Sequence, residues 1–196
     1  MRMNLPNLLT SLRILSIPLL VSLYYLPDRL ISLEVKDISA TAIFILAAAT
    51  DWLDGYLARR LNQASAFGAF LDPVADKLMV AGALLMLLQL GRVEAAVALV
   101  IIGREIAISA LREWMARIGR AKSVAVAYIG KVKTVSQMIA IPLLLYSADL
   151  PWIMNAESTQ ILGTILINIA AVLTVISMLY YLRMAYPYAG AASDDF

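Results

Sequence analysis

Four aspartates gather in one short and otherwise largely apolar stretch of this 196-residue chain, at Asp51, Asp54, Asp72 and Asp76. A carboxylate at the centre of a bilayer costs at least about 2.5 kcal/mol, so ionisable groups in apolar segments usually serve a function. The few basic residues nearby cannot neutralise all four carboxylates. We therefore expect the aspartates to bind cations.

The spacing of these carboxylates indicates which of them can meet. Asp51 and Asp54 are three residues apart and Asp72 and Asp76 are four apart, so each pair shares one face of a helix. The polar and small residues at 61–68 allow a turn between the two helices. Two antiparallel helices would bring the pairs together, and four carboxylates can hold two divalent cations in an arrangement suited to phosphoryl-type displacement.

Composition narrows both the class of protein and the class of metal. Hydrophobic residues make up 62% of the chain and charged residues 15%, with a mean hydropathy of +0.81. These values are typical of integral membrane proteins. The chain contains no cysteine and no histidine. Oxygen ligands favour Mg²⁺ or Mn²⁺ over zinc.

The apolar segments predict an all-α integral membrane protein with six transmembrane helices. We expect one domain over residues 1–196, with a juxtamembrane start at 1–13 and a flexible tail at 185–196. The six segments are 8–26, 38–60, 70–90, 94–116, 126–147 and 161–182.

Basic residues predict the orientation of these helices. If the N-terminus is cytoplasmic, thirteen of the sixteen lysines and arginines fall at cytoplasmic ends and loops. This asymmetry satisfies the positive-inside rule. Both termini and all four aspartates are then expected on the cytoplasmic side, where the carboxylates cost less than at the bilayer midplane.

The aspartates belong to a longer pattern that resembles the signature of the CDP-alcohol phosphatidyltransferases. The pattern is Asp51-x-x-Asp54-Gly55-x-x-Ala58-Arg59, then eight residues to Gly68, then x-x-x-Asp72-x-x-x-Asp76. The resemblance implies two metal ions, Mg²⁺ or Mn²⁺, held by the four aspartates, with Asp76 also acting as the base for the acceptor hydroxyl. It further implies six transmembrane helices and a homodimer in the bacterial inner membrane. The residues that it places against CDP-diacylglycerol are Pro6, Asn7, Thr10, Asp54, Gly55, Ala58, Arg59, Ser65 and Gly68.

Structural alternatives exist for single members of this set. Asp72 before Pro73 is also typical of a helix N-cap followed by proline at the first helical position. The glycines could serve helix packing. Asn7, Thr10 and Arg13 form a polar stripe that is typical of an interfacial helix. The tyrosines at 24–25 and 180–188 are interpreted as interfacial anchors.

Other segments bear on the acceptor alcohol. NLPNLLTSLRIL, IGREIAISALREWMA and SVAVAYIGKVKT resemble the phosphatidylglycerophosphate synthase branch of the family, which implies sn-glycerol 3-phosphate as the acceptor. A phosphate dianion needs cationic partners. The candidates are Arg104, Arg112, Lys131 and Lys133, although basic residues at these positions could also reflect topology alone.

Two alternatives stay open at this point. The same transfer could use inositol phosphate or serine as the acceptor. A divalent cation transporter could also carry intramembrane carboxylates, but it would spread them across the membrane depth. We expect the bilayer and the two substrates as partners, and no nucleic acid.

Overall fold

The computed structural model describes residues 5–61, 66–120, 128–149 and 154–188, and for 5–7, 52–61, 66–67, 69 and 128–129 it describes the backbone alone. The described residues form helices and no strand. The elements are α1 (Leu5–Tyr25), α2 (Leu33–Leu61), α3 (Ala66–Gln89), α4 (Ala95–Arg117), α5 (Tyr128–Tyr146), α6 (Ala156–Ala185) and the short 3₁₀ helix η2 (Tyr186–Tyr188).

Each of the six predicted segments forms a helix, so the all-α prediction is confirmed for the described residues. α6 begins five residues before the predicted start because Asn155 caps it, its side-chain oxygen accepting from the Ser158 backbone N–H at 2.9 Å. α3 begins at Ala66, which puts Pro73 inside the helix. The N-cap interpretation of Asp72 is therefore wrong. Of the predicted flexible tail at 185–196, residues 185–188 belong to the end of α6 and to η2, and residues 189–196 lie outside the described residues.

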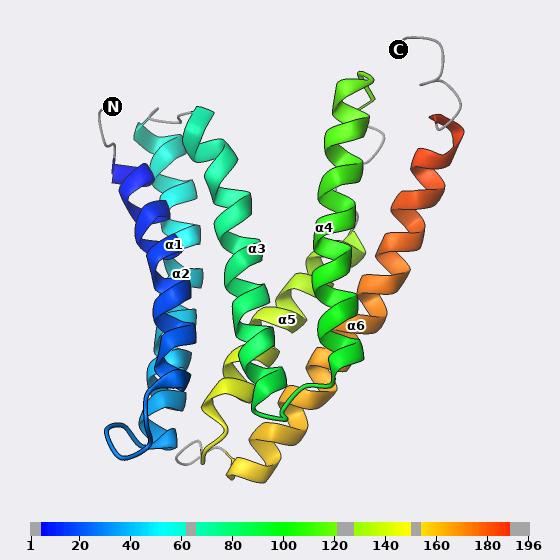
Figure 1. Ribbon diagram of the computed structural model, residues 1–196. Helices are drawn as coiled ribbons and strands as arrows, with labels where there is room; N and C mark the ends of the chain where they lie inside the picture. Colours follow the sequence, from blue (N-terminus) through cyan, green and yellow to red (C-terminus); the bar gives the residue numbers. More distant parts are fainter. Residues whose placement is uncertain (1–4, 62–65, 121–127, 150–153, 189–196) are drawn as a thin grey trace.

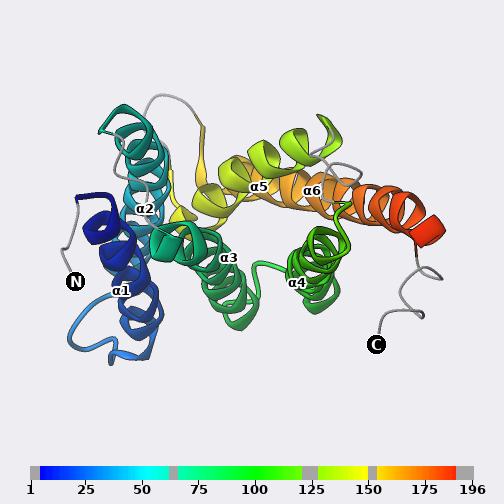
Figure 2. The same cartoon turned by 90° about the horizontal axis from the view of Figure 1, so that it is seen from above.

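The helices form two groups that share a central core. α1 packs against α2 and α3, while α6 packs against α5 and α4. α5 also contacts α2 and α3, so it joins the two groups (Figure 1). Viewed from above, α3 and α4 lie on the same side of α5 (Figure 2). This arrangement positions residues from α2, α3, α4 and α5 around one space.

The core lies between these two groups and depends on close helix packing. Buried residues from all six helices form one apolar cluster, with Leu20, Phe44 and Leu84 among its largest members. Gly163 lets α6 approach α5, since a Cβ built there would lie 2.8 Å from Leu144 Cγ. Gly91, with φ of 69°, takes the left-handed conformation in the turn between α3 and α4. α6 therefore packs closely against α5, and the turn at Gly91 leads from α3 into α4.

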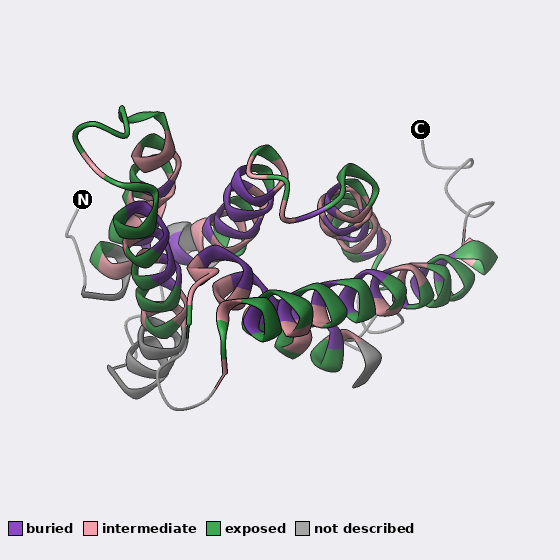
Figure 3. Cartoon of the chain, turned by 90° about the horizontal axis from the view of Figure 1, so that it is seen from below, coloured by how far each residue is buried: buried purple, intermediate pink, exposed green. Residues whose placement is uncertain are grey.

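The described surface is apolar where a water-soluble protein would be polar. Exposed residues line the outward side of α6 (Figure 3) and include large apolar side chains such as Ile165, Val172 and Leu179. By length and composition, two stretches of the described helices can cross a membrane, Leu8–Tyr25 and Ala156–Tyr188. Polar side chains are instead buried inside, among them Arg104 and Lys133. This distribution suits a lipid environment.

Candidate active site

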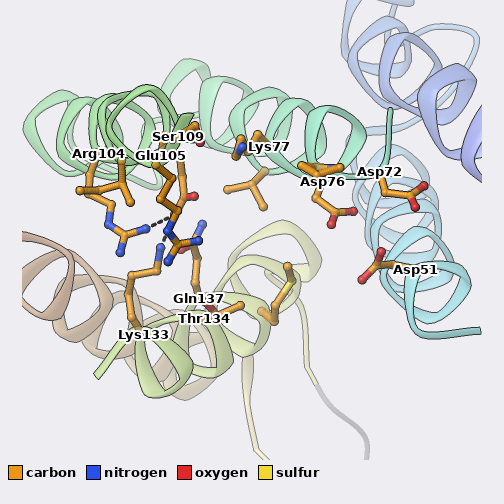
Figure 4. Close-up of a pocket in the computed structure, with 15 residues that line it drawn as sticks. Asp51, Asp72, Asp76, Lys77, Arg104, Glu105, Ser109, Lys133, Thr134 and Gln137 are labelled. Atoms are coloured by element: carbon orange, nitrogen blue, oxygen red, sulfur yellow. Dashed lines mark hydrogen bonds and ion pairs between the residues drawn. The ribbon is translucent and has the colours of Figure 1, made fainter. Parts of the chain in front are cut away.

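A cavity of about 560 Å³ lies between α2, α3, α4 and α5. Carboxylates line one side of it and cationic side chains line the other. Figure 4 shows Asp51, Asp72 and Asp76 on one side, and Arg104 and Lys133 across the cavity from them. Both charged groups that the sequence singled out therefore face the same space.

The acidic side is built from two helices and organised by a third. Asp51 comes from α2, whereas Asp72 and Asp76 lie one turn apart on α3, as their spacing predicts. Thr10 of α1 donates a hydrogen bond to Asp72 Oδ1 at 2.6 Å. One nitrogen of Arg13, Nη1, donates to Asp51 Oδ1 at 2.9 Å and to Asp76 Oδ1 at 2.8 Å. α1 thus links the carboxylates of α2 to those of α3.

Arg13 is a site residue whose role the sequence interpretation missed. Its side chain is 1% exposed, while the side chains of Asp51 and Asp76 remain 45% and 39% exposed. Two residues of the polar stripe, Thr10 and Arg13, are buried against the aspartates, which contradicts the interfacial-helix interpretation for them; the third, Asn7, lies outside the described side chains. An arginine three residues after Thr10 in an apolar helix was the available signal, because a buried guanidinium needs carboxylate partners.

The donor atoms of the carboxylates are of the type that a hard divalent cation binds. All their donor atoms are oxygens, and the partly exposed side chains of Asp51 and Asp76 line the cavity. Within the part of the chain whose side chains are described, no group of three or more acidic residues is close enough to hold a metal ion. Asp54, the fourth predicted ligand, lies outside the described side chains. The described side chains therefore do not test the predicted pair of metal ions.

The cationic side is more deeply buried. Arg104 is 7% exposed and Lys133 is 3% exposed. Glu105 bridges them: its Oε1 accepts from Arg104 Nη1 at 3.4 Å and also from the Lys133 ammonium. On the α6 side, Arg104 Nη2 donates to Ser177 Oγ at 3.2 Å. The same α4 face also carries Arg112, which lines the cavity.

This cluster has unused capacity for an anion. Arg104, Arg112 and Lys133 carry three positive charges, and Glu105 offsets one, leaving a net charge of +2. The Nε atoms of both arginines are buried and have no hydrogen-bond partner among the described residues. A buried donor without a partner costs free energy. The arrangement favours a dianion with oxygen acceptors, such as a phosphate monoester.

Of the four cationic residues that the sequence proposed, three line the cavity and one does not. Arg104, Arg112 and Lys133 line it, but Lys131 is an exposed residue of α5 outside the lining. Two residues along a helix rotate a side chain by about 200°, so Lys131 and Lys133 face opposite directions. Lys77 of α3, which the sequence did not assign to the acceptor, does line the cavity.

The residues predicted to contact the nucleotide are described only in part. Thr10 is buried and bonded to Asp72, and Gly68 is buried at the start of α3. Ser65 lies outside the described residues. The others lie on described backbone without described side chains: Pro6 and Asn7 on α1, and Asp54, Gly55, Ala58 and Arg59 on α2.

Comparison with known proteins gives a family match over nearly the whole chain. The family model described as CDP-alcohol phosphatidyltransferase matches residues 3–182. A protein of Escherichia coli (strain K12) is 47% identical over 187 residues, which cover 94% of this chain and 96% of the relative. A protein of Shigella flexneri serotype 5b (strain 8401) is 46% identical over the same shares. Both relatives are named CDP-diacylglycerol–glycerol-3-phosphate 3-phosphatidyltransferase.

Proposed function

Because the chain belongs to the CDP-alcohol phosphatidyltransferase family, we propose that it transfers the phosphatidyl group of CDP-diacylglycerol to sn-glycerol 3-phosphate. The products are phosphatidylglycerol phosphate and CMP. The observation that carries this proposal is the single cavity with carboxylates on one side and a buried cationic cluster on the other. The names of the relatives support the same reaction.

The cavity suggests how the two substrates are oriented. The acceptor's phosphate lies at Arg104, Arg112 and Lys133, where a net charge of +2 meets a dianion. Its free hydroxyl then points toward Asp76 on the opposite side. Because both reactants are held in one cavity, a bimolecular step becomes effectively unimolecular, with the reacting atoms already oriented.

The transfer exchanges one phosphorus–oxygen bond for another. The acceptor hydroxyl oxygen bonds to the lipid-side phosphorus, and its proton passes to Asp76 as general base. The bond from that phosphorus to the CMP oxygen breaks, and the electron pair leaves with CMP. Arg13, which donates to Asp76 Oδ1 at 2.8 Å, holds this carboxylate in orientation.

We assign the metal ligands to the aspartates, for two ions of Mg²⁺ or Mn²⁺. Asp51, Asp54, Asp72 and Asp76 would hold them, and the oxygen-only donor set fits such cations. When bound, these ions supply electrostatic stabilisation for the charge that develops on CMP. Thr10 fixes one carboxylate through its hydrogen bond to Asp72.

The nucleotide lies on the α1–α2 side of the aspartates in this proposal. Its contacts are those that the family signature implies: Pro6, Asn7, Thr10, Asp54, Gly55, Ala58, Arg59, Ser65 and Gly68. Small residues permit close approach of the pyrophosphate to the backbone, and an arginine suits phosphate recognition. The burial of Thr10 and Gly68 beside the aspartate region supports this placement.

We further propose that all six helices cross the bacterial inner membrane, with both termini and the cavity on the cytoplasmic side, and that the protein is a homodimer. The apolar exposed surface supports the membrane assignment. The distribution of basic residues supports the orientation. Acyl chains would stay in lipid while the cytidine stays in water.

The cationic cluster also bears on the alternatives. An anionic acceptor explains the buried Arg104 and Lys133 and the half-buried Arg112 better than serine does, because serine carries no phosphate. A divalent cation transporter would place such cations away from its ion path, whereas here they share the cavity with the carboxylates. Inositol phosphate carries the same charged group, so experiment must separate it from glycerol 3-phosphate.

The test is incorporation of labelled sn-glycerol 3-phosphate into lipid by the purified protein, with CDP-diacylglycerol and Mg²⁺ or Mn²⁺. We expect stoichiometric CMP release and loss of both signals with a chelator. No incorporation with either metal would contradict the specific assignment. CMP release with inositol phosphate in place of glycerol 3-phosphate would keep the reaction class and change the acceptor.

A further inference from the structure

The two arginines of the cationic cluster share one aromatic ring. The guanidinium carbon of Arg104 lies 5.6 Å from the centroid of the Tyr181 ring, and that of Arg112 lies 5.2 Å from it. The Tyr181 hydroxyl also accepts a hydrogen bond from Arg112 Nη2 at 3.1 Å. Tyr181 is fully buried, at 0% exposure. One side chain of α6 therefore contacts two arginines of α4, Arg104 and Arg112.

A second residue on the same face of α6 also contacts one of these arginines. Ser177 lies one turn before Tyr181 and is also 0% exposed. Its hydroxyl donates to the Thr174 carbonyl at 2.9 Å, which leaves its oxygen lone pairs to accept from Arg104 Nη2 at 3.2 Å. α6 therefore presents acceptor groups and the Tyr181 ring to the arginines.

The chemistry of these partners matters for anion binding. Two neighbouring guanidinium groups on one helix, one buried and one half-buried, repel each other and must be stabilised. A carboxylate partner, such as Glu105 at Arg104, stabilises a guanidinium but offsets one positive charge that would attract a phosphate. An aromatic ring and neutral hydroxyl oxygens offer partial negative charge without cancelling the net charge. Tyr181 and Ser177 are partners of this neutral kind.

We propose that Tyr181 is a positioning residue that holds the guanidinium groups of Arg104 and Arg112 toward the acceptor's phosphate, with Ser177 assisting at Arg104. This inference rests on the proposed function, in which that end of the cavity binds sn-glycerol 3-phosphate. Tyr181 itself does not line the cavity. It acts through the arginines, so it sets the affinity for the acceptor and leaves the chemistry at Asp76 unchanged.

A purely structural role is the alternative, because Tyr181 also packs in an apolar cluster with Ile108, Met115 and Ala185. The two roles predict different kinetics. A packing residue affects the amount of folded protein and both substrates together. A positioning residue raises KM for the acceptor while kcat and KM for CDP-diacylglycerol stay unchanged.

The experiment compares graded variants of the full-length protein with a neighbouring control. Tyr181→Phe keeps the ring and removes the hydroxyl, and Tyr181→Leu removes both; Ser177→Ala removes the acceptor for Arg104. Tyr186→Leu is the matched control, since Tyr186 is 80% exposed. We expect KM for glycerol 3-phosphate to rise about threefold in Tyr181→Phe and about tenfold or more in Tyr181→Leu. Tyr186→Leu should leave it unchanged.

A second measurement does not depend on turnover. Inorganic phosphate should raise the thermal unfolding midpoint of the wild type, and this rise should shrink in Tyr181→Phe, whose core packing is retained. Equal increases in both KM values, or an undiminished phosphate effect in Tyr181→Phe, would overturn the inference. If the wild type fails to use glycerol 3-phosphate, the proposed function fails, and the phosphate arm still decides whether Tyr181 organises an anion site.

Discussion

Two charged clusters at opposite ends of the helices use similar residues in different ways. At one end, Asp37 is 5% exposed, and its two oxygens accept from the Tyr24 hydroxyl at 3.0 Å and from Arg92 Nη2 at 2.6 Å. Arg92 Nη1 donates to the backbone carbonyls of Leu144 and Leu145 at 2.9–3.2 Å. This cluster joins α1, α2, α5 and the turn between α3 and α4, and its charged groups have their partners within the cluster.

The cavity cluster is arranged differently. Asp51 and Asp76 pair with Arg13 yet keep 45% and 39% of their side chains exposed. Arg104 and Arg112 have buried Nε atoms without a partner among the described residues. A buried ion pair alone therefore says little about function. Partial exposure to a cavity, together with unused donors, distinguishes the candidate site from the structural cluster.

The largest expected effect is at the proposed base. Asp76→Asn should lower kcat by about 10²–10⁴-fold, the usual contribution of a general base. Asparagine keeps an oxygen that can accept from Arg13, so the local packing should survive. We expect CMP binding to be retained in an equilibrium binding assay. Loss of binding together with turnover would argue against a distinct role as base.

The structural cluster should respond in the opposite manner. Asp37→Asn leaves Arg92 without its carboxylate and should reduce the free energy of unfolding by about 3–5 kcal/mol, the cost of breaking a buried pair. The folded fraction should keep its KM values and kcat. Denaturant titration in detergent measures the first effect and steady-state kinetics the second. A selective change in either KM with unchanged stability would erase the distinction between the clusters.

Two of the predicted acceptor-binding residues should respond differently to substitution, because Arg112 lines the cavity and Lys131 is exposed. Arg112→Ala should raise KM for glycerol 3-phosphate by about 10–100-fold, since hydrogen bonds to charged groups are worth about 1.5–3 kcal/mol. Lys131→Ala is the matched control and should change KM less than about twofold, because Lys131 is an exposed charge. If both substitutions raised KM by a similar factor, Arg112 and Lys131 would act through their positive charge in general, and Arg112 would not be a specific contact of the phosphate.

The sequence predicted the helices and the carboxylates because both depend on local patterns. Apolar runs located all six helices to within about five residues, and i, i+4 spacing placed Asp72 and Asp76 on one face of α3. Their chemistry followed from the family signature. The metal pair, the orientation and the homodimer stay predictions.

What the sequence did not predict depends on contacts between distant residues. Arg13 meets Asp51 and Asp76 across 38 and 63 residues of chain, which no helical spacing reveals. The tyrosines were interpreted as interfacial anchors, yet Tyr181 is buried beneath two arginines. Helix packing decided these positions. The sequence could have excluded Lys131 from the cavity once Lys133 was placed there, because two residues along a helix point in opposite directions.

We propose that the cationic end of the cavity recognises the acceptor's phosphate. The most direct test is the ratio of kcat/KM for glycerol 3-phosphate to that for glycerol, measured in the wild type, Arg104→Ala and Lys131→Ala. We predict a large ratio in the wild type and in Lys131→Ala, and a ratio that collapses in Arg104→Ala because the phosphate has lost a buried partner. An unchanged ratio in Arg104→Ala would contradict the account.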